Sequence, residues 1–219
     1  GSVYRDPETG KDITLGNSWK ADVIIDKSYP ENRGLENYRD FALYFQDEDN
    51  IIGTSFMPYL QNVAGLTGVN YRLEPWTYRE DEGCELGNMF TACVAADSDP
   101  ATPVLKAHAG DRVMINIFGA HNEQNQMFNM DGHQWRRHLN QENSDMIDAE
   151  EFGGGEYIQA FVNAGGTYSN PGTYLWLNAR TPYQQAGQWG YFKVLPAGER
   201  SILPLGGAAP KAGKSASKG

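Results

Sequence analysis

The feature that most constrains the fold is a series of short apolar segments between residues 88 and 195, with no helical segment between them. Five of these segments read "MFTACVA", "VLKAHAG", "DRVMINIFGA", "EYIQAFVNAG" and "GTYLWLN". Within the third, Val113, Ile115 and Ile117 fall on one side, which is the period of two expected of a half-buried strand. Strands at this spacing without intervening helices predict an all-β sandwich rather than alternating strand–helix units.

Another strand is predicted earlier in the chain, where "YRDFALYFQDED" begins at Tyr38 and alternates apolar with polar residues. Residues 1–35 are polar and turn-rich, and we interpret them as a linker or extension; the alternative is an edge strand formed around Ala21–Asp26. From Ala197 onward the chain has too few apolar residues to order itself. These observations predict three parts: an extension at 1–35, one β-sandwich domain at 36–196 and a flexible tail at 197–219.

The charge of the chain excludes several classes of partner. A net charge of −10 argues against binding nucleic acid or an anionic membrane surface, because both repel an acidic protein. No run of 18 apolar residues is present, so we expect no transmembrane span. No secretory leader is visible either, so we expect a mature, cytosolic or excised chain.

The two cysteines, Cys84 and Cys93, lie close together in "CELGNMFTAC". They are open to three interpretations: reduced thiols, a disulfide that closes a short loop in an exported protein, or a metal site. The metal site is the weakest, because no CxxC spacing exists and the nearest histidine, His108, lies beyond a turn. We predict the disulfide, and with it an extracellular or periplasmic location.

Several longer stretches together resemble a known family. "TPVLKAHAGDRVMINIFGAHNEQNQMFNMDGHQW" resembles the middle of a cupredoxin domain of multicopper oxidases, and "NPGTYLWLNARTPYQQAGQWGYFKV" resembles the last hairpin of that domain. "NYRDFALYFQDEDNIIGTSFMPY" and "GVNYRLEPW" are similar to the large ceruloplasmin-like and bacterial manganese-oxidase-like members. The resemblance covers about residues 1–196 and implies a cupredoxin-like Greek-key β-sandwich.

The resemblance also implies where a type 1 copper site would lie. The first histidine ligand of the family corresponds to Gln126, the cysteine to Asn178, the second histidine to Tyr183 and the axial ligand to Gln188. A blue-copper site needs two imidazoles, a thiolate and a weak axial ligand, and none of these four side chains is comparable. The resemblance therefore implies a copper-site frame without copper ligands.

The trinuclear copper motifs of the family are absent in the same way. The HxHG motif corresponds to the run from Asn129 through Asp131 to Gly132, and the HCH motif to Leu177 and Ala179 on either side of Asn178. We therefore expect no cofactor in this chain and copper in partner domains.

Two hypotheses of function follow from these features. In the first, the chain is a copper-free domain or subunit of a large multicopper oxidase, accessory to the oxidation of a metal ion such as Mn(II) or Fe(II) coupled to reduction of O₂. Its partners would be other cupredoxin domains or subunits. In the second, it is an independent β-sandwich that serves as a structural or interaction module of an extracellular assembly, because fold does not fix function.

Three other groups of residues could form binding sites, but each also has a plainer structural interpretation. His133 and His138 share a segment with Asp131 and offer a weak alternative metal site, although a five-residue offset in a strand places them on opposite faces. The acidic segments 46–50 and 141–151 are calcium-binding candidates, but solvated loops explain them better. Four tryptophans could form a sugar-binding platform, although residues of this kind more often pack in the core or on a sheet face: Trp76, Trp135, Trp176 and Trp189.

Overall fold

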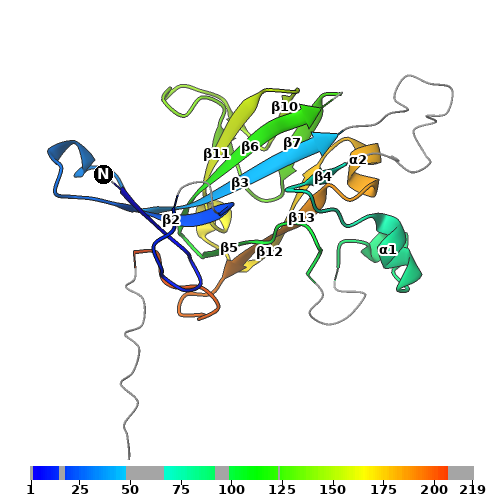
Figure 1. The fold of residues 1–219 in the computed structure, drawn as a ribbon, viewed down its shortest axis with the longest axis horizontal. Helices are drawn as coiled ribbons and strands as arrows, with labels where there is room; N and C mark the ends of the chain where they lie inside the picture. The colour runs from blue at the N-terminus through cyan, green and yellow to red at the C-terminus, as the bar shows by residue number, and fades with distance from the viewer. Residues whose placement is uncertain (1, 15–17, 48–66, 92–98, 123, 207–219) are drawn as a thin grey trace, which may run out of the picture.

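The computed structural model describes residues 2–14, 18–47, 67–91, 99–122 and 124–206. Its larger sheet has the strand order β1-β2-β3-β6-β11, with β4 paired to β3 (Figure 1). The members of this first sheet are β1 (Ser2–Arg5), β2 (Lys20–Ile25), β3 (Tyr38–Asp47), β4 (Gly68–Val69), β6 (Arg112–Asn122) and β11 (Tyr157–Asn163).

The second sheet packs against the first and has the order β10-β7-β12-β13-β5. Its strands are β5 (Leu105–His108), β7 (Gln126–Met130), β10 (Ala149–Phe152), β12 (Gly172–Asn178) and β13 (Trp189–Leu195). A small hairpin-like pair joins β8 (Trp135–Arg136) to β9 (Met146–Ile147). The helical segments are short: α1 (Trp76–Asp81), α2 (Thr181–Gln185), and three 3₁₀ turns, η1 (Pro30–Asn32), η2 (Leu86–Asn88) and η3 (Gly166–Tyr168).

The connections between the sheets confirm the predicted β-sandwich. β3 pairs in parallel with β6 and β13 in parallel with β5, whereas the other pairs within both sheets are antiparallel. Parallel neighbours cannot be joined by a tight hairpin, so the chain crosses from one sheet to the other, as in a Greek key. The chain is therefore an all-β sandwich along the part that the structure describes.

The core lies between the two sheets and follows the alternation seen in the sequence. Phe41, Leu43 and Phe45 of β3 are 0–1% exposed, and they meet side chains of the second sheet such as Phe128 and Trp176. Trp176 is fully buried, and so are Trp135 and Trp189. The sugar-binding platform considered for the tryptophans is therefore wrong for these three, which pack inside the protein.

The N-terminal extension contributes strands to the first sheet. β2 pairs antiparallel with both β1 and β3, so residues 1–35 contribute strands to the first sheet, but the strand at its edge is β1, and the strand predicted around Ala21–Asp26 lies inside the sheet as β2. The acidic segment 141–151 also differs from a loop, because β10 begins within it and pairs with β7. Glutamates on an edge strand can face solvent while Phe152 is fully buried, which is why acidity alone was a poor guide there.

The C-terminal segment 197–206 packs against the sandwich, although the sequence places it in a flexible tail. Ile202 is 2% exposed, and the backbone N–H of Leu203 donates to the carbonyl oxygen of Pro7 at 2.8 Å. The predicted tail is therefore wrong for 197–206, because one buried isoleucine and a few backbone hydrogen bonds order a segment of low apolar content. Residues 207–219 lie outside the described residues.

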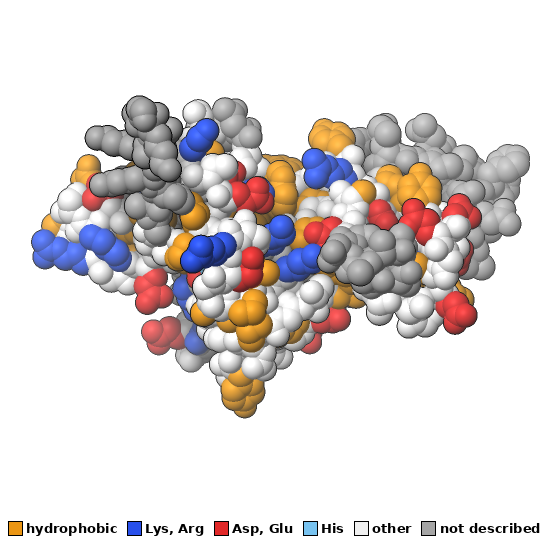
Figure 2. All heavy atoms as spheres, turned by 90° about the horizontal axis from the view of Figure 1, so that it is seen from below, with side chains coloured by type: hydrophobic (Ala, Val, Ile, Leu, Met, Phe, Trp, Pro, Cys, Tyr) orange, Lys and Arg blue, Asp and Glu red, His pale blue; other side chains and the backbone are white. Residues whose placement is uncertain are grey.

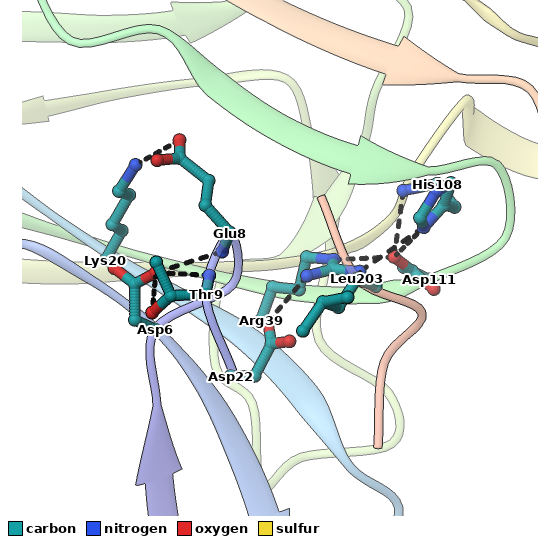
Figure 3. Close-up of polar contacts among 9 residues, drawn as sticks. All are labelled: Asp6, Glu8, Thr9, Lys20, Asp22, Arg39, His108, Asp111 and Leu203. Atoms are coloured by element: carbon teal, nitrogen blue, oxygen red, sulfur yellow. Dashed lines mark hydrogen bonds and ion pairs between the residues drawn. The ribbon is translucent and has the colours of Figure 1, made fainter. Parts of the chain in front are cut away.

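A buried ion cluster joins this segment to the first sheet (Figure 3). The guanidinium of Arg39, 0% exposed, donates to Asp22 at 2.6 Å, to Asp111 at 2.6 Å and to the carbonyl oxygen of Leu203 at 2.7 Å. Burial raises the pKa of Asp22 to about 6, and the nearby carboxylate of Asp111 adds to the effect even though Arg39 opposes it. One cation thus serves two carboxylates and a backbone carbonyl.

The surface carries charged side chains of both signs (Figure 2). Figure 2 shows acidic and basic side chains scattered among hydrophobic ones on the face that it presents. Among the described helices, none has the length and apolar character needed to cross a membrane.

Candidate functional site

The four residues that the resemblance assigns to the type 1 copper positions meet at one end of the sandwich. Gln126 begins β7, Asn178 ends β12, Tyr183 lies in α2 and Gln188 directly precedes β13. Their side chains are 0–2% exposed, and a fifth buried residue, Asp47 at the end of β3, joins them. We call these five residues the amide cluster.

The local sequence explains how the loop between β12 and β13 presents its residues. Pro182 stands in the first turn of α2, where its fixed φ suits a helix start and its missing N–H costs nothing. Gly187 follows the helix with φ of +112°, and a Cβ there would lie 2.5 Å from the backbone nitrogen of Glu74. Only glycine fits this turn, which delivers Gln188 to the cluster.

The amide cluster is closed by hydrogen bonds among its own members. Nδ2 of Asn178 donates to Oε1 of Gln126 and, at 2.6 Å, to Oε1 of Gln188. Nε2 of Gln126 donates to Oδ2 of Asp47 at 3.0 Å, and the hydroxyl of Tyr183 donates to the same oxygen at 2.7 Å. The side chains therefore fill the space between the strand ends with polar groups that hydrogen-bond to one another.

Backbone contacts fix the direction of this network. Oδ1 of Asn178 accepts from the backbone N–H of Arg180 at 3.0 Å and of Met127 at 3.3 Å, so its amino group must face the cluster centre. Nε2 of Gln188 donates outward to the carbonyl oxygen of Gln46 at 3.0 Å. A flipped amide at Asn178 would set donors against donors, so one arrangement is strongly preferred.

The electrostatics of the cluster disfavour acid–base chemistry. Burial raises the pKa of Tyr183, and the hydrogen bond to the Asp47 carboxylate raises that pKa further. The phenol therefore stays protonated at neutral pH and serves as a hydrogen-bond donor. A general base or a phenolate ligand would need the opposite shift.

The donor set of the amide cluster does not fit copper. A copper site of this kind requires imidazole nitrogens and a thiolate, whereas the cluster offers amide, phenol and carboxylate groups. The centre of the cluster is also occupied by the amino group of Asn178, which donates hydrogen bonds to the side-chain carbonyl oxygens of Gln126 and Gln188. Across the described ranges, no group of three or more His, Cys, Asp or Glu residues is arranged to hold a metal ion.

No family model matches the chain, and no curated protein matches its sequence. Solved structures that resemble it include the multicopper oxidase mgLAC, at 14% identity and a TM-score of 0.42, over 73% of this chain and 44% of that one. The blue copper oxidase from Nitrosomonas europaea matches at 13% and 0.41, over 72% and 43%. The 2F4 variant of McoA multicopper oxidase from the hyperthermophile Aquifex aeolicus matches at 13% and 0.44, over 71% and 29%.

This chain spans less than half the length of each of these three proteins. At such TM-scores the likeness supports no argument about activity, and the assignment of an all-β sandwich rests on the two sheets themselves. Neither the ceruloplasmin-like nor the manganese-oxidase-like resemblance is addressed by these structures.

The residues at the trinuclear positions lie outside the core. Asn129 of β7 and Leu177 of β12 are register partners and are half-buried, and the amide of Asn129 donates to the carbonyl oxygen of Asp148 at 3.0 Å. Asp131 and Ala179 are exposed at the ends of the same strands. These four residues therefore mark the outer face of the second sheet, away from the amide cluster.

At the weak alternative metal site of His133 and His138, both ring nitrogens of His133 are already hydrogen-bonded within the protein. His133 is 2% exposed and follows β7 in a turn; its Nδ1 donates to the carbonyl oxygen of Asp131 at 2.8 Å, and its Nε2 accepts from the N–H of Gly165 at 3.0 Å. With both ring nitrogens occupied and its pKa lowered by burial, His133 is a neutral core histidine. His138 is exposed on the following loop.

Cys84 is buried and disulfide-bonded, and no cysteine among the described residues is free. Its predicted partner, Cys93, lies outside the described residues, so the pairing stays a prediction.

Sequence reasoning missed one member of the amide cluster. The sequence places Asp47 in the acidic segment 46–50, for which we expect a solvated loop, and most of that segment lies outside the described residues. The signal was present nevertheless, because Asp47 continues the inward series of Phe41, Leu43 and Phe45 at intervals of two. A carboxylate at the next inward position of a core strand indicates a buried polar site.

Proposed function

We propose that this chain is a copper-free cupredoxin domain or subunit of a larger multicopper oxidase, and that it contributes structure and packing surface rather than a redox centre. Its partners would be other cupredoxin domains that carry the copper. The assembly would work in an extracellular or periplasmic compartment, where the predicted disulfide is stable. The whole assembly would oxidise a metal ion such as Mn(II) or Fe(II) and reduce O₂.

The observation that carries the proposal is the amide cluster. Four positions chosen by resemblance, spread over residues 126–188, converge within hydrogen-bonding reach of one another or of one shared carboxylate. Four positions without a common structural role would not be expected to converge in this way. The cluster then performs the mechanical role of a metal centre, because it ties the ends of β3, β7, β12 and β13 together.

The proposal also gives a role to the outer face of the second sheet. In the family that the sequence resembles, trinuclear sites form between domains, so Asn129 and Leu177 would face a neighbouring domain there. The half-buried apolar surface of Leu177 suits such a packing role. The redox chemistry would then belong to sites that other domains complete.

The proposal is tested by restoring the four ligands in the full chain: Gln126→His, Asn178→Cys, Tyr183→His and Gln188→Met. If the positions are those of a type 1 site, the fourfold variant should bind about one equivalent of Cu(II) and develop an intense blue thiolate-to-copper band. Copper content and the visible absorption spectrum are the measurements. The unchanged protein should bind under about half an equivalent at micromolar Cu(II) and remain colourless.

Asn178→Cys alone is the matched control, because it supplies the thiolate without the imidazoles and should give no stable blue species. Copper bound by the fourfold variant without the thiolate band would show that the four side chains do not share one ligand geometry. Circular dichroism separates that result from a failure to fold. The proposal would then give way to the independent β-sandwich module.

A further inference from the structure

A cleft of about 410 Å³ lies at the free edge of the first sheet, and none of the five residues of the amide cluster lines it. One wall is the edge strand β11, and the other is the loop 137–141 that follows β8. In Figure 1 the chain between β7 and β10, drawn in yellow-green, loops beside the end of β11. A volume of this size is in the range of small-molecule binding sites.

The ring of Tyr157 forms a rigid aromatic wall of the cleft. It stacks on Phe118 of β6 at 4.8 Å between ring centres, and Phe118 stacks in turn on Tyr44 of β3 at 4.6 Å. The hydroxyl of Tyr157 donates to Oδ1 of Asn116 at 2.6 Å. Because Phe118 covers one side of the ring and β11 is the sheet edge, the other side of the ring is directed to the cleft.

The opposite wall is a loop whose backbone is held in place. The N–H of Gln141 donates to the carbonyl oxygen of His138 at 3.1 Å, and the N–H of His138 donates to Oγ of Ser144 at 2.9 Å. The side chains of His138, Asn140 and Gln141 make no hydrogen bond to any described residue. The loop therefore presents several unsatisfied donors and acceptors on a fixed backbone, which lowers the entropic cost of binding.

The charge within the cleft is balanced. Arg137 and Glu150 both line it, and their Nε and Oε1 atoms lie 3.7 Å apart as an ion pair. Gln159, on β11, also lines the cleft, and its Nε2 donates to Oδ1 of Asn116 at 3.1 Å. A balanced charge disfavours phosphates and carboxylates, and the density of amide groups disfavours purely apolar ligands.

We propose that this cleft binds a neutral saccharide, with one sugar ring against the face of Tyr157 and its hydroxyls bound by His138, Gln141 and Gln159. A sugar ring has an apolar C–H face that suits an aromatic ring, and its hydroxyls both donate and accept. The lining of the cleft offers the same combination. This inference does not depend on the proposed copper-oxidase role.

The test is a titration of the ¹⁵N-labelled full chain with cellobiose, maltose and lactose, each followed by backbone amide shifts. A ligand of this size in an open cleft is expected to bind with a Kd on the order of millimolar. At least one disaccharide should give saturable shifts confined to residues 137–141 and 157–159. Sorbitol, an acyclic polyol, should give none, since it has no ring face to stack.

Variants distinguish stacking on Tyr157 from nonspecific binding of the sugar. Tyr157→Ala should weaken binding about tenfold or more, whereas Tyr157→Phe keeps the ring and should stay within about threefold of the unchanged protein. Tyr168→Ala, at an exposed tyrosine of η3 that does not line the cleft, is the matched control and should change nothing. Absence of saturable shifts with all three disaccharides would overturn the proposal, as would equal binding by Tyr157→Ala.

Discussion

Removal of the Arg39 guanidinium offers the sharpest test of what holds this sandwich together. Arg39→Met keeps most of the side-chain volume and deletes the cation that Asp22, Asp111 and the Leu203 carbonyl share at 2.6–2.7 Å. Two carboxylates that are nearly excluded from solvent would then face each other without a counter-charge. The hydrogen bond that holds the C-terminal segment at Leu203 would be lost at the same time.

The magnitude follows from the burial of the group. Breaking a buried ion pair by removing one partner costs about 3–5 kcal/mol, because the remaining charge stays desolvated. Leaving the Leu203 carbonyl without its donor adds about 1 kcal/mol or more. We therefore expect the free energy of unfolding to fall by about 4–6 kcal/mol at neutral pH, a large share of the stability of a typical domain.

Urea unfolding followed by tryptophan fluorescence measures this loss. Arg5→Met is the matched control, because Arg5 pairs with Asp12 at 3.2 Å in an exposed setting and should cost under about 1 kcal/mol. If Arg39→Met does not fold, Arg39→Lys keeps the charge with fewer donors and should lose about 1–3 kcal/mol. The loss should shrink at about pH 5, because burial raises the pKa of Asp22 to about 6 and a protonated Asp22 needs no counter-charge. A value for Arg39→Met within about 1 kcal/mol of the unchanged protein at neutral pH would refute the reasoning.

Three further predictions follow from other sites. Asn178→Leu leaves the buried Oε1 atoms of Gln126 and Gln188 without a donor and should lower the free energy of unfolding by about 2–4 kcal/mol, measured by urea unfolding. Tyr71→Gly relieves a left-handed tyrosine (φ 60°) whose ring is 90% exposed, so the melting temperature should rise by a few degrees, equivalent to about 1 kcal/mol; a lower value would contradict the strain argument. Burial raises the pKa of Asp40 from 3.8 to about 6, so its contribution to stability is present below pH 3.8 and is lost, by about 2–3 kcal/mol, as pH rises through 6. Asp40→Asn should make the fall in unfolding free energy across that window shallower, with a remaining part due to Asp22, whose pKa is also raised to about 6; an unchanged slope would count against the assignment.

Much of the sandwich was predictable because strand alternation is a local property. The buried series Phe41, Leu43 and Phe45 follows from the period of two, and so does the series in β6. The prediction failed for segments that are ordered by contacts with residues far away in the sequence. Ile202 has no periodic neighbours, and its segment is ordered by hydrogen bonds to Arg39 and Pro7, which lie far away in the sequence.

The candidate site was predictable only in part, and only through resemblance. Alignment of motifs selected Gln126, Asn178, Tyr183 and Gln188, but nothing in their spacing indicates that amides would bind one another. That information lies in the geometry of several separate elements. The part of the site that spacing could have supplied is Asp47, whose inward position follows from β3, and there the acidic character of "QDEDN" favoured a turn instead.

The chemistry of the amide cluster bears on why polar groups fill this corner rather than apolar ones. An apolar replacement would leave the N–H groups of Met127 and Arg180 and the carbonyl of Gln46 without the partners that the cluster now gives them. These contacts are partly buried, and a fully buried group left without a partner costs about 1–3 kcal/mol, so hydrophobic packing would first have to offset some of that cost at each group. Amides satisfy these backbone groups and one another at once. Polar side chains are therefore favoured over apolar ones in this corner, and Asn178→Leu measures that difference directly.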